Sequence, residues 1–258
     1  MFDSHAHYDD DKFEGDRDEV IYTAHVSGVN YILNASVDVQ STIKSIELAD
    51  KYDFIYASAG IHPHEAGKAT ERDSSLIYEI ACKSPKVVAI GEIGLDYHYE
   101  YSHKEQQIAW FIRQIEIAKQ LKLPVIIHNR EAHIDTLDII KSYSVKDCGG
   151  VLHCYSGSLE MLKAVLENNM SISVGGPVTF NNARKLTDVV KYVPFDKLLV
   201  ETDCPYLSPE PFRGRRNDSS LIKFIIEKIA SIKGVDFETA SKITTQNAKA
   251  LFCIDKFY

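Results

Sequence analysis

The sequence predicts a single α/β domain over residues 1–258, a (β/α)8 barrel (TIM barrel) with one extra C-terminal helix. Three observations lead to this fold. Eight short apolar segments rich in β-branched residues recur along the chain, helical patterns separate them, and several of the apolar segments are continuous rather than alternating. Continuous hydrophobicity is typical of parallel strands covered on both faces. Eight strand–helix units, with about 250 residues in total, form a closed barrel as their simplest arrangement.

The strand signal is clearest at Val87-Val88-Ala89-Ile90 and Leu198-Leu199-Val200, where no polar residue interrupts the apolar run. The predicted strands cover residues 1–7, 29–36, 55–62, 87–94, 123–129, 149–156, 171–176 and 198–203. With 45% hydrophobic and 26% charged residues and no break in composition, the chain has the character of one globular domain.

The clearest helix begins at Ser102, because Ser102 and Glu105 have the spacing of a capping box. Apolar residues then recur every three or four positions as far as Leu121, and Pro124 opens the next strand. Other helices are predicted over residues 17–27, 39–52, 74–83, 132–143, 159–169, 182–192 and 219–233. A ninth helix, at about residues 236–252, is expected to pack outside the barrel.

The charge of the chain limits its partners. Twenty-nine basic residues against 37 acidic ones give a net charge of -8, so the molecule as a whole repels polyanions and any contact with nucleic acid must be local. The first eleven residues are acidic where a secretory signal would be basic and then apolar, and no apolar run approaches ~20 residues. We therefore expect a cytoplasmic protein without a membrane partner, and a monomer.

Residue types that bind metals stand at the carboxyl ends of most predicted strands: His5 and His7, His62, Glu92, His128, His153 and Asp203. In a barrel these ends meet at one rim. His5 and His7 are two residues apart, so an extended strand places both on one face, and Asp3 is expected on that face too. Carboxylates among imidazoles away from bulk water are costly unless cations compensate them.

The number of ligands indicates two divalent metal ions. Four histidines and two carboxylates exceed the three protein ligands of a typical open zinc site. One division consistent with the spacing places His5, His7 and Asp203 on one ion and His128 and His153 on the other, with Glu92 bridging them. Magnesium is favoured by its abundance in cells, and imidazole ligands also suit zinc, manganese, iron or nickel.

Several residues near this rim have other expected roles. His62 is predicted to face the substrate, His64 either faces it or caps a turn, and Asp96 holds a neighbouring ligand by a hydrogen bond. Arg130 and the run Arg213-Gly214-Arg215-Arg216 are the cationic groups near the rim, and we expect phosphate contacts from Arg130, Arg213 and Arg215. Ordinary structural roles are predicted for His25, His98, His103 and His133.

Six motifs, in order along nearly the whole chain, resemble the TatD family of metal-dependent deoxyribonucleases in the amidohydrolase superfamily. They are Asp3-Ser4-His5-Ala6-His7, Gly60-Ile61-His62-Pro63-His64, Gly91-Glu92-Ile93-Gly94-Leu95-Asp96-Tyr97, His128-Asn129-Arg130-Glu131-Ala132, His153-Cys154-Tyr155-Ser156-Gly157-Ser158 and Glu201-Thr202-Asp203-Cys204-Pro205-Tyr206-Leu207. The resemblance implies the same six metal ligands, and a nuclease that trims DNA from the 3' end with magnesium. The chain departs from the family at Cys154, at Phe212 and in lacking a proline shortly after Asn217.

These expectations describe a hydrolase in which two cations sharing Glu92 lower the pKa of a water from 15.7 toward ~7. Asp203 accepts its proton, while His62 and an arginine stabilise the charge that grows on a phosphodiester. The predicted substrate is a single-stranded or 3' end of DNA. One alternative keeps the centre but cleaves an ester, lactone, cyclic amide or aminoacyl-tRNA bond. Another, a noncatalytic binding module, predicts an incomplete ligand set, whereas all six positions are filled.

Overall fold

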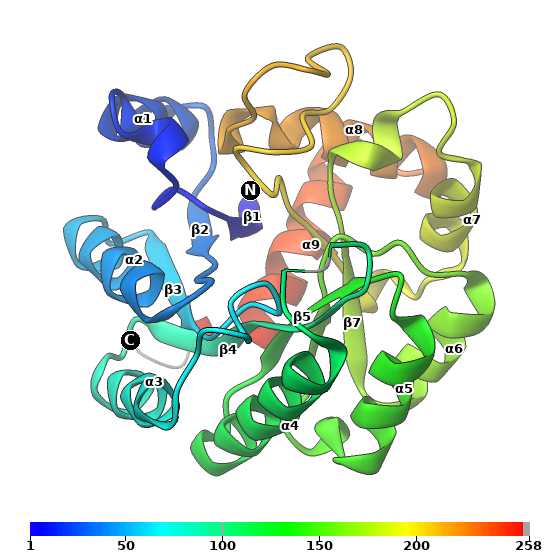
Figure 1. Ribbon diagram of the computed structural model, residues 1–258. Coiled ribbons are helices and arrows are strands. Elements are labelled where there is room, and N and C mark those ends of the chain that lie inside the picture. The colour runs from blue at the N-terminus through cyan, green and yellow to red at the C-terminus, as the bar shows by residue number, and fades with distance from the viewer. Residues whose placement is uncertain (100, 255–258) are drawn as a thin grey trace.

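A computed structural model, which describes residues 1–99 and 101–254, shows the predicted barrel. Its eight strands are parallel and neighbours in sequence order from β1 to β8. Ala6, at the end of β1, pairs with Cys204, just beyond β8, and this bridge brings the first and last strands together. The helices surround the strands, as Figure 1 shows.

The strands are β1 (Phe2–Ala6), β2 (Tyr31–Asn34), β3 (Ile55–Ala59), β4 (Val87–Asp96), β5 (Val125–Arg130), β6 (Gly150–Leu152), β7 (Met170–Val174) and β8 (Leu198–Val200). All strands except β4 and β5 end earlier than predicted, β6 and β8 among them. Cys154 and Asp203 take positive φ angles of 42° and 57°, which turn the chain out of the sheet after β6 and β8. In contrast, β4 continues to Asp96, so Glu92 lies within this strand rather than near its end.

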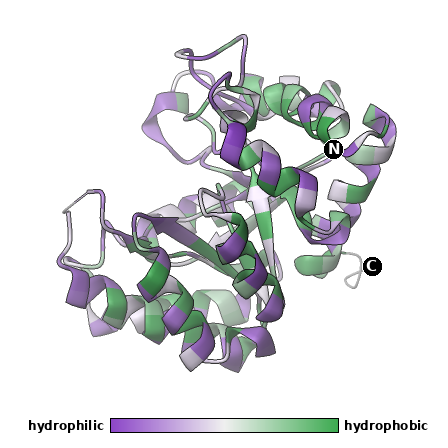
Figure 2. Cartoon of the chain, turned by 90° about the vertical axis from the view of Figure 1, so that its right-hand side faces the viewer, coloured by the Kyte–Doolittle hydropathy of each residue, from purple (hydrophilic) through white to green (hydrophobic). Residues whose placement is uncertain are grey.

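The helices are α1 (Arg17–Val26), α2 (Val39–Lys51), α3 (Glu71–Lys83), α4 (Lys104–Leu121), α5 (His133–Ser142), α6 (Leu159–Glu167), α7 (Arg184–Tyr192), α8 (Ile222–Lys233) and α9 (Phe237–Leu251). Their surfaces carry both hydrophobic and hydrophilic residues, as Figure 2 shows. None of the helices in the described part of the chain combines the length and the apolar character needed to cross a bilayer.

The cap of α4 differs from the prediction. His103, not Ser102, precedes the first turn, and its N–H donates to Gln106 Oε1 at 3.2 Å. Ser102 Oγ instead donates to the His64 carbonyl oxygen at 2.8 Å and accepts the Gly67 N–H at 2.9 Å. The serine therefore fixes the loop after β3, and the real capping pair begins one residue later.

Helix α9 covers the end of the barrel at which the strands begin. Leu33, Val88, Ile126, Val151 and Leu199 form one apolar cluster with residues near the end of α9, Ala248 and Phe252 among them. The rings of Phe2 and Phe252 lie 6.1 Å apart. The extra helix was predicted to pack outside the barrel, and it does so in a specific place: it covers the opening at the amino-terminal ends of the strands, opposite the rim that carries the polar residues.

Candidate metal centre

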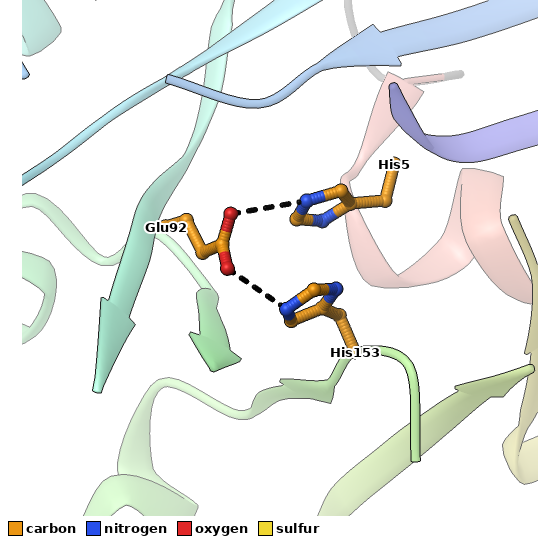
Figure 3. Close-up of side chains that lie close together, drawn as sticks. All are labelled: His5, Glu92 and His153. Atoms are coloured by element: carbon orange, nitrogen blue, oxygen red, sulfur yellow. Dashed lines mark ion pairs between the residues drawn. The ribbon is translucent and has the colours of Figure 1, made fainter. Parts of the chain in front are cut away.

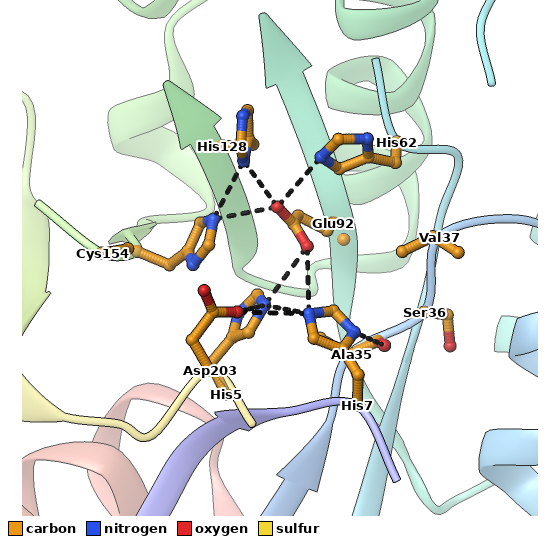
Figure 4. Close-up of polar contacts among 12 residues, drawn as sticks. His5, His7, Ala35, Ser36, Val37, His62, Glu92, His128, Cys154 and Asp203 are labelled. Atoms are coloured by element: carbon orange, nitrogen blue, oxygen red, sulfur yellow. Dashed lines mark hydrogen bonds and ion pairs between the residues drawn. The ribbon is translucent and has the colours of Figure 1, made fainter. Parts of the chain in front are cut away.

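Seven side chains converge at the carboxyl ends of the strands, and we call them the central cluster. They are His5, His7, His62, Glu92, His128, His153 and Asp203. Their elements are β1, β4 and β5 and the segments that follow β1, β3, β6 and β8. Figure 4 shows His5, His7, His62, His128 and Asp203 around Glu92. The structure thus brings together all six sequence-predicted ligands and His62, from positions up to 198 residues apart.

The two oxygens of Glu92 face different groups of histidines. Oε2 lies 3.2 Å from His5 Nε2 and 3.7 Å from His7 Nε2. Oε1 lies 2.8 Å from His128 Nδ1 and 2.9 Å from His153 Nε2. In Figure 3 the carboxylate lies between His5 and His153, with one oxygen toward each ring. This is the arrangement expected of a carboxylate that bridges two cations.

Asp203 belongs to the Oε2 side of the cluster. Its Oδ1 lies 3.4 Å from His7 Nε2 and 3.8 Å from His5 Nε2. Its positive φ is a conformation that aspartate tolerates better than most residues, and its N–H donates to the His5 carbonyl oxygen at 2.9 Å. The backbone after β8 thus positions the carboxylate beside the two β1 histidines.

Hydrogen bonds outside the cluster set which ring nitrogens face inward with a lone pair. His7 Nδ1 lies 2.9 Å from the Ala35 carbonyl oxygen, which can only accept, so Nδ1 carries the hydrogen and Nε2 is free to bind a cation. His128 Nε2 lies 3.0 Å from Asp96 Oδ2, which leaves Nδ1 free in the same way. The hydrogen bond expected from Asp96 to a neighbouring ligand is therefore present.

His62 has the opposite polarity. Its Nδ1 accepts the His64 N–H at 3.1 Å, so in the neutral ring Nε2 carries the hydrogen. Nε2 lies 3.3 Å from Glu92 Oε1. Burial lowers the pKa of His62 to about 4, so the ring is neutral at pH 7 and points an N–H into the centre. This side chain is built to donate a hydrogen bond, whereas His7 and His128 are built to bind cations.

The donor atoms fit divalent metal ions. Two groups place their ligand atoms within 4.8 Å of one another: His5, Glu92 and His153, and His5, His7 and Asp203. His62, Glu92 and His128 lie equally close, but His62 presents an N–H there. His5 Nε2 and His7 Nε2 are 3.1 Å apart, and His128 Nδ1 and His153 Nε2 are 3.2 Å apart. A hydrogen shared between two ring nitrogens occupies the lone pair of only one of them, whereas a cation between them can bind the lone pairs of both.

Charges within the cluster depend on one another. Burial acts to raise the pKa of Glu92, but its interactions with His153, His62 and His5 outweigh burial and hold the pKa well below its usual range. Burial acts to lower the pKa of His153, yet Glu92 and Glu201 raise it well above normal. Without cations, the buried carboxylate is thus compensated by protons on the imidazoles.

Burial and contacts with charged neighbours also have opposite effects on the pKa values of His7 and Asp203. Burial acts to lower the pKa of His7, but the hydrogen bond to Asp203 and the charge of Glu92 raise it to about 9. Burial acts to raise the pKa of Asp203, and the His7 hydrogen bond lowers it below its usual value. Asp203 is therefore ionised at pH 7, and its side chain keeps 15% of its surface exposed.

Glycine at position 94 allows β4 and β5 to approach closely behind the centre. Gly94 has a φ of 136°, and a Cβ there would collide with the carbonyl oxygen of His128. The N–H of Glu92 donates to the Ser36 carbonyl oxygen at 2.8 Å. The backbones that carry Glu92 and His128 are thus held by neighbouring strands rather than by the cluster itself.

The structure also reveals a buried carboxylate that the sequence reasoning did not assign, Glu201. Its Oε1 accepts the Cys154 N–H at 2.6 Å, and its Oε2 accepts the Ser173 hydroxyl. Oε1 lies 3.6 Å from His153 Nδ1, an atom with no hydrogen-bond partner among the described residues. The signal was available, because a glutamate directly after the apolar Leu198–Val200 run is a charge in a buried strand.

Asp3 does not share the face of His5 and His7, contrary to the prediction. The register of β1 against β2 shifts between Asp3 and Ala6, so the simple alternation of side chains fails there. Asp3 is fully buried and accepts hydrogen bonds from the Thr202 N–H at 2.9 Å and from Ser219 Oγ at 2.5 Å. It ties β1 to the segments around β8 and α8.

The remaining histidines lie outside the cluster. His64 Nε2 is 2.9 Å from Asp96 Oδ2, so this ring is held by the carboxylate that also holds His128. The four histidines predicted to be structural contact other groups. His25 Nδ1 lies beside the Val29 carbonyl oxygen, His98 Nδ1 beside Glu131 and His133 Nδ1 beside Asn129, while His103 caps α4.

Three arginines predicted to bind phosphate are exposed on segments that border the rim. Arg130 holds its guanidinium 4.7 Å from the Tyr99 ring centroid, Arg213 lies 4.3 Å from that of Phe180, and Arg215 lies 5.9 Å from that of Phe212. Arg216 differs, because it pairs with Asp16 through two nitrogens. Of the basic run, Arg216 is therefore a structural cation.

Comparison with known proteins agrees with this geometry. Residues 2–253 match the family model described as "TatD related DNase". The chain is 45% identical over 255 residues to the "Uncharacterized metal-dependent hydrolase YabD" of Bacillus subtilis, covering 99% of this chain and 100% of that protein. It is 33% identical over 259 residues to the "3'-5' ssDNA/RNA exonuclease TatD" of Escherichia fergusonii, covering 98% and 99%.

A solved structure shows the same fold. The crystal structure of YJJV, a TatD homologue from Escherichia coli, superposes with a TM-score of 0.92 at 28% identity and covers 98% of this chain and 97% of its own. Sequence and structure comparisons thus extend over nearly the full chain. The chain belongs to the TatD family of metal-dependent hydrolases.

Proposed function

We propose that this protein is a 3'-5' exonuclease that hydrolyses phosphodiester bonds at single-stranded ends of DNA with two divalent cations. The observation that carries the proposal is the position of Glu92, whose two oxygens face separate groups of histidines. Such a pair of cation sites suits phosphoryl chemistry, in which charge grows on both the attacking and the leaving oxygen. The TatD relative named as a 3'-5' ssDNA/RNA exonuclease supports the same substrate class.

His5, His7 and Asp203 would hold one cation. His128 and His153, whose facing nitrogens are 3.2 Å apart, would hold the other, with Glu92 between the two groups. When bound, the two cations lower the pKa of water and neutralise charge on a phosphate. Magnesium is the proposed cation in cells, and the imidazole ligands also suit Zn²⁺, Mn²⁺ or Ni²⁺.

Asp203 and His62 supply the proton chemistry of this proposal. Water attacks phosphorus and its proton passes to Asp203, while the bond from phosphorus to the leaving oxygen breaks. The leaving oxygen takes up a proton from solvent water, and Asp203 returns the proton it accepted to solvent. Asp203 suits this role because it is ionised and partly exposed. His62 Nε2–H donates a hydrogen bond to a phosphate oxygen as its charge grows, which its neutral ring can do across the neutral pH range.

The rim offers groups that match single strands. The rings of Tyr99 and Tyr101 stack 5.5 Å apart and are 39% and 69% exposed, and Arg130 covers Tyr99. Exposed aromatic rings beside arginine are typical of surfaces on which unpaired bases stack. Arg130, Arg213 and Arg215 are proposed to contact phosphates. Because the net charge of the chain is -8, we expect it to bind the ends of strands and to bind them more weakly as the salt concentration rises. We also propose that the protein is a monomer in the cytoplasm.

The proposal is tested with end-labelled single-stranded DNA. The metal-loaded protein is incubated with this DNA and, separately, with ester and lactone substrates, each with and without chelator. We expect stepwise shortening from the 3' end that disappears with chelator and in His128→Ala and Asp203→Asn. A variant of an exposed acid, Glu160→Gln, serves as the control. Hydrolysis confined to the small esters would contradict the proposal and favour the alternative substrate class.

A further inference from the structure

A cavity of about 370 Å³ opens directly beside the central cluster. It lies between the segments that follow β6 and β7, and its lining includes Cys154, Gly175, Pro177, Phe180, Asn182 and Arg184. Cys154 follows His153 in the chain and donates its N–H to Glu201. A Cβ at Gly175 would lie 3.5 Å from Glu201 Cγ. The inner wall of the cavity is therefore the outer side of the segment that carries His153.

The wall of the cavity combines flat apolar surface with cations. Pro177 and Phe180 are only partly buried, and the Arg213 guanidinium lies 4.3 Å from the Phe180 ring centroid. Arg184 and Lys185 are exposed on the same lining. None of the described residues that line it is acidic, although the chain carries 37 acidic residues. The cavity is thus a local exception to the negative charge of the protein.

We propose that this cavity binds the base of the terminal nucleotide of a single-stranded substrate, an inference that rests on the proposed function. A nucleobase presents a flat π-face to Phe180 and a polar edge to Asn182, and the phosphate beside it matches Arg184 and Arg213. An aliphatic ester or lactone has neither an aromatic face nor a negative charge for these groups. The occupant that uses the whole wall is a nucleotide.

The position of the cavity gives it a role in selecting strand ends. Cys154, which follows His153 in the chain, lines the same cavity as Phe180, so a base held there places the phosphodiester of its nucleotide toward the central cluster. A base that occupies a pocket cannot continue in a stacked duplex, which favours unpaired ends. The cavity therefore contributes specificity for the terminal nucleotide, while the cluster contributes the chemistry.

The test compares Phe180→Ala with Phe180→Tyr, which keeps an aromatic ring. Tyr192→Ala removes an exposed ring at the far end of α7 and is the matched control. Base stacking on one aromatic side chain is worth a factor of about 5 to 150 in binding. We expect Phe180→Ala to raise KM for a single-stranded oligonucleotide by that factor, and Phe180→Tyr and Tyr192→Ala to stay within about twofold of the native protein.

A second arm changes the substrate instead of the protein, so it does not depend on the variant folding. The native protein is given an oligonucleotide whose 3'-terminal nucleotide lacks its base. We expect the same rise in KM as for Phe180→Ala, and no further rise when the two changes are combined. Hydrolysis of the oligonucleotide with the abasic 3' end, which offers no terminal base to Phe180, should be equal in the native protein, Phe180→Ala and Tyr192→Ala.

The outcomes separate the two proposals. If the native protein cleaves bis(p-nitrophenyl) phosphate but no DNA, the proposed function fails. If it shortens DNA but neither Phe180→Ala nor the abasic end changes KM, the exonuclease proposal stands and the base-binding cavity is refuted. Equal losses for the abasic-ended and the intact oligonucleotide in Phe180→Ala would also refute it, because they would indicate damage to the metal centre.

Discussion

Replacing Glu201 by glutamine tests whether the buried carboxylate behind His153 supports the metal centre. The amide retains an oxygen that can accept the Cys154 N–H, so the fold is expected to survive. What is lost is the negative charge 3.6 Å from His153 Nδ1. Between full charges at this separation, an effective dielectric constant of 20 gives about 4 to 5 kcal/mol as an upper bound. Partners that orient a metal-binding histidine typically contribute about 10- to 100-fold in metal affinity, or about 1.4 to 2.7 kcal/mol.

We therefore expect Glu201→Gln to bind Mn²⁺ about 10- to 100-fold more weakly than the native protein, with kcat partly restored at saturating metal. The assay is a Mn²⁺ titration of bis(p-nitrophenyl) phosphate hydrolysis, with thermal unfolding measured in chelator. Glu160→Gln, on an exposed face, is the control. A native metal affinity in Glu201→Gln would refute the reasoning, as would a large loss of stability in chelator, which would make Glu201 a structural residue.

Three further predictions follow from the same geometry. Glu92→Gln should lower kcat by more than about 100-fold, because one side chain contributes to both groups of ligands, and metal analysis should show fewer than two bound ions. Arg213→Gln should raise KM for DNA and make KM less dependent on salt concentration. Arg216→Gln should instead lower the free energy of unfolding by less than about 1 kcal/mol, because Arg216 pairs with Asp16. Measurements of KM at several salt concentrations and thermal melts distinguish the two variants. Metal affinity should rise with pH up to about 9, because a cation must displace the proton that His7 holds below its raised pKa; calorimetry in buffers of different ionisation enthalpy measures that release.

The fold was predictable because its signals are local and repeated. Continuous apolar runs such as Val87–Ile90 identify buried parallel strands, and helical patterns between them leave few closed arrangements. The positions of His5, His128 and Asp203 then follow, since all stand where their strands end. The two oxygens of Glu92 face His5 and His7 on one side and His128 and His153 on the other, and the division of ligands between two ions stays a prediction.

The remaining features depend on contacts that no local pattern contains. Asp3 leaves the ligand face because of a register shift in β1, which period-two alternation cannot show. Ser102 is recruited by His64 and Gly67, 38 and 35 residues away, so its fit to a capping box was coincidental. Arg216 resembles its neighbours in sequence and differs only because Asp16 lies opposite it.

The contact between Phe2 and Phe252 has a consequence for how the protein is made. During synthesis, β1 leaves the ribosome long before α9 exists, so the inward ring of Phe2 lacks its Phe252 partner until α9 has been made. Neighbouring strand–helix units can form early, but β1 cannot pair with the segment after β8 until that segment has been made. We therefore expect the closed barrel to form only after β8 and α9 have left the ribosome.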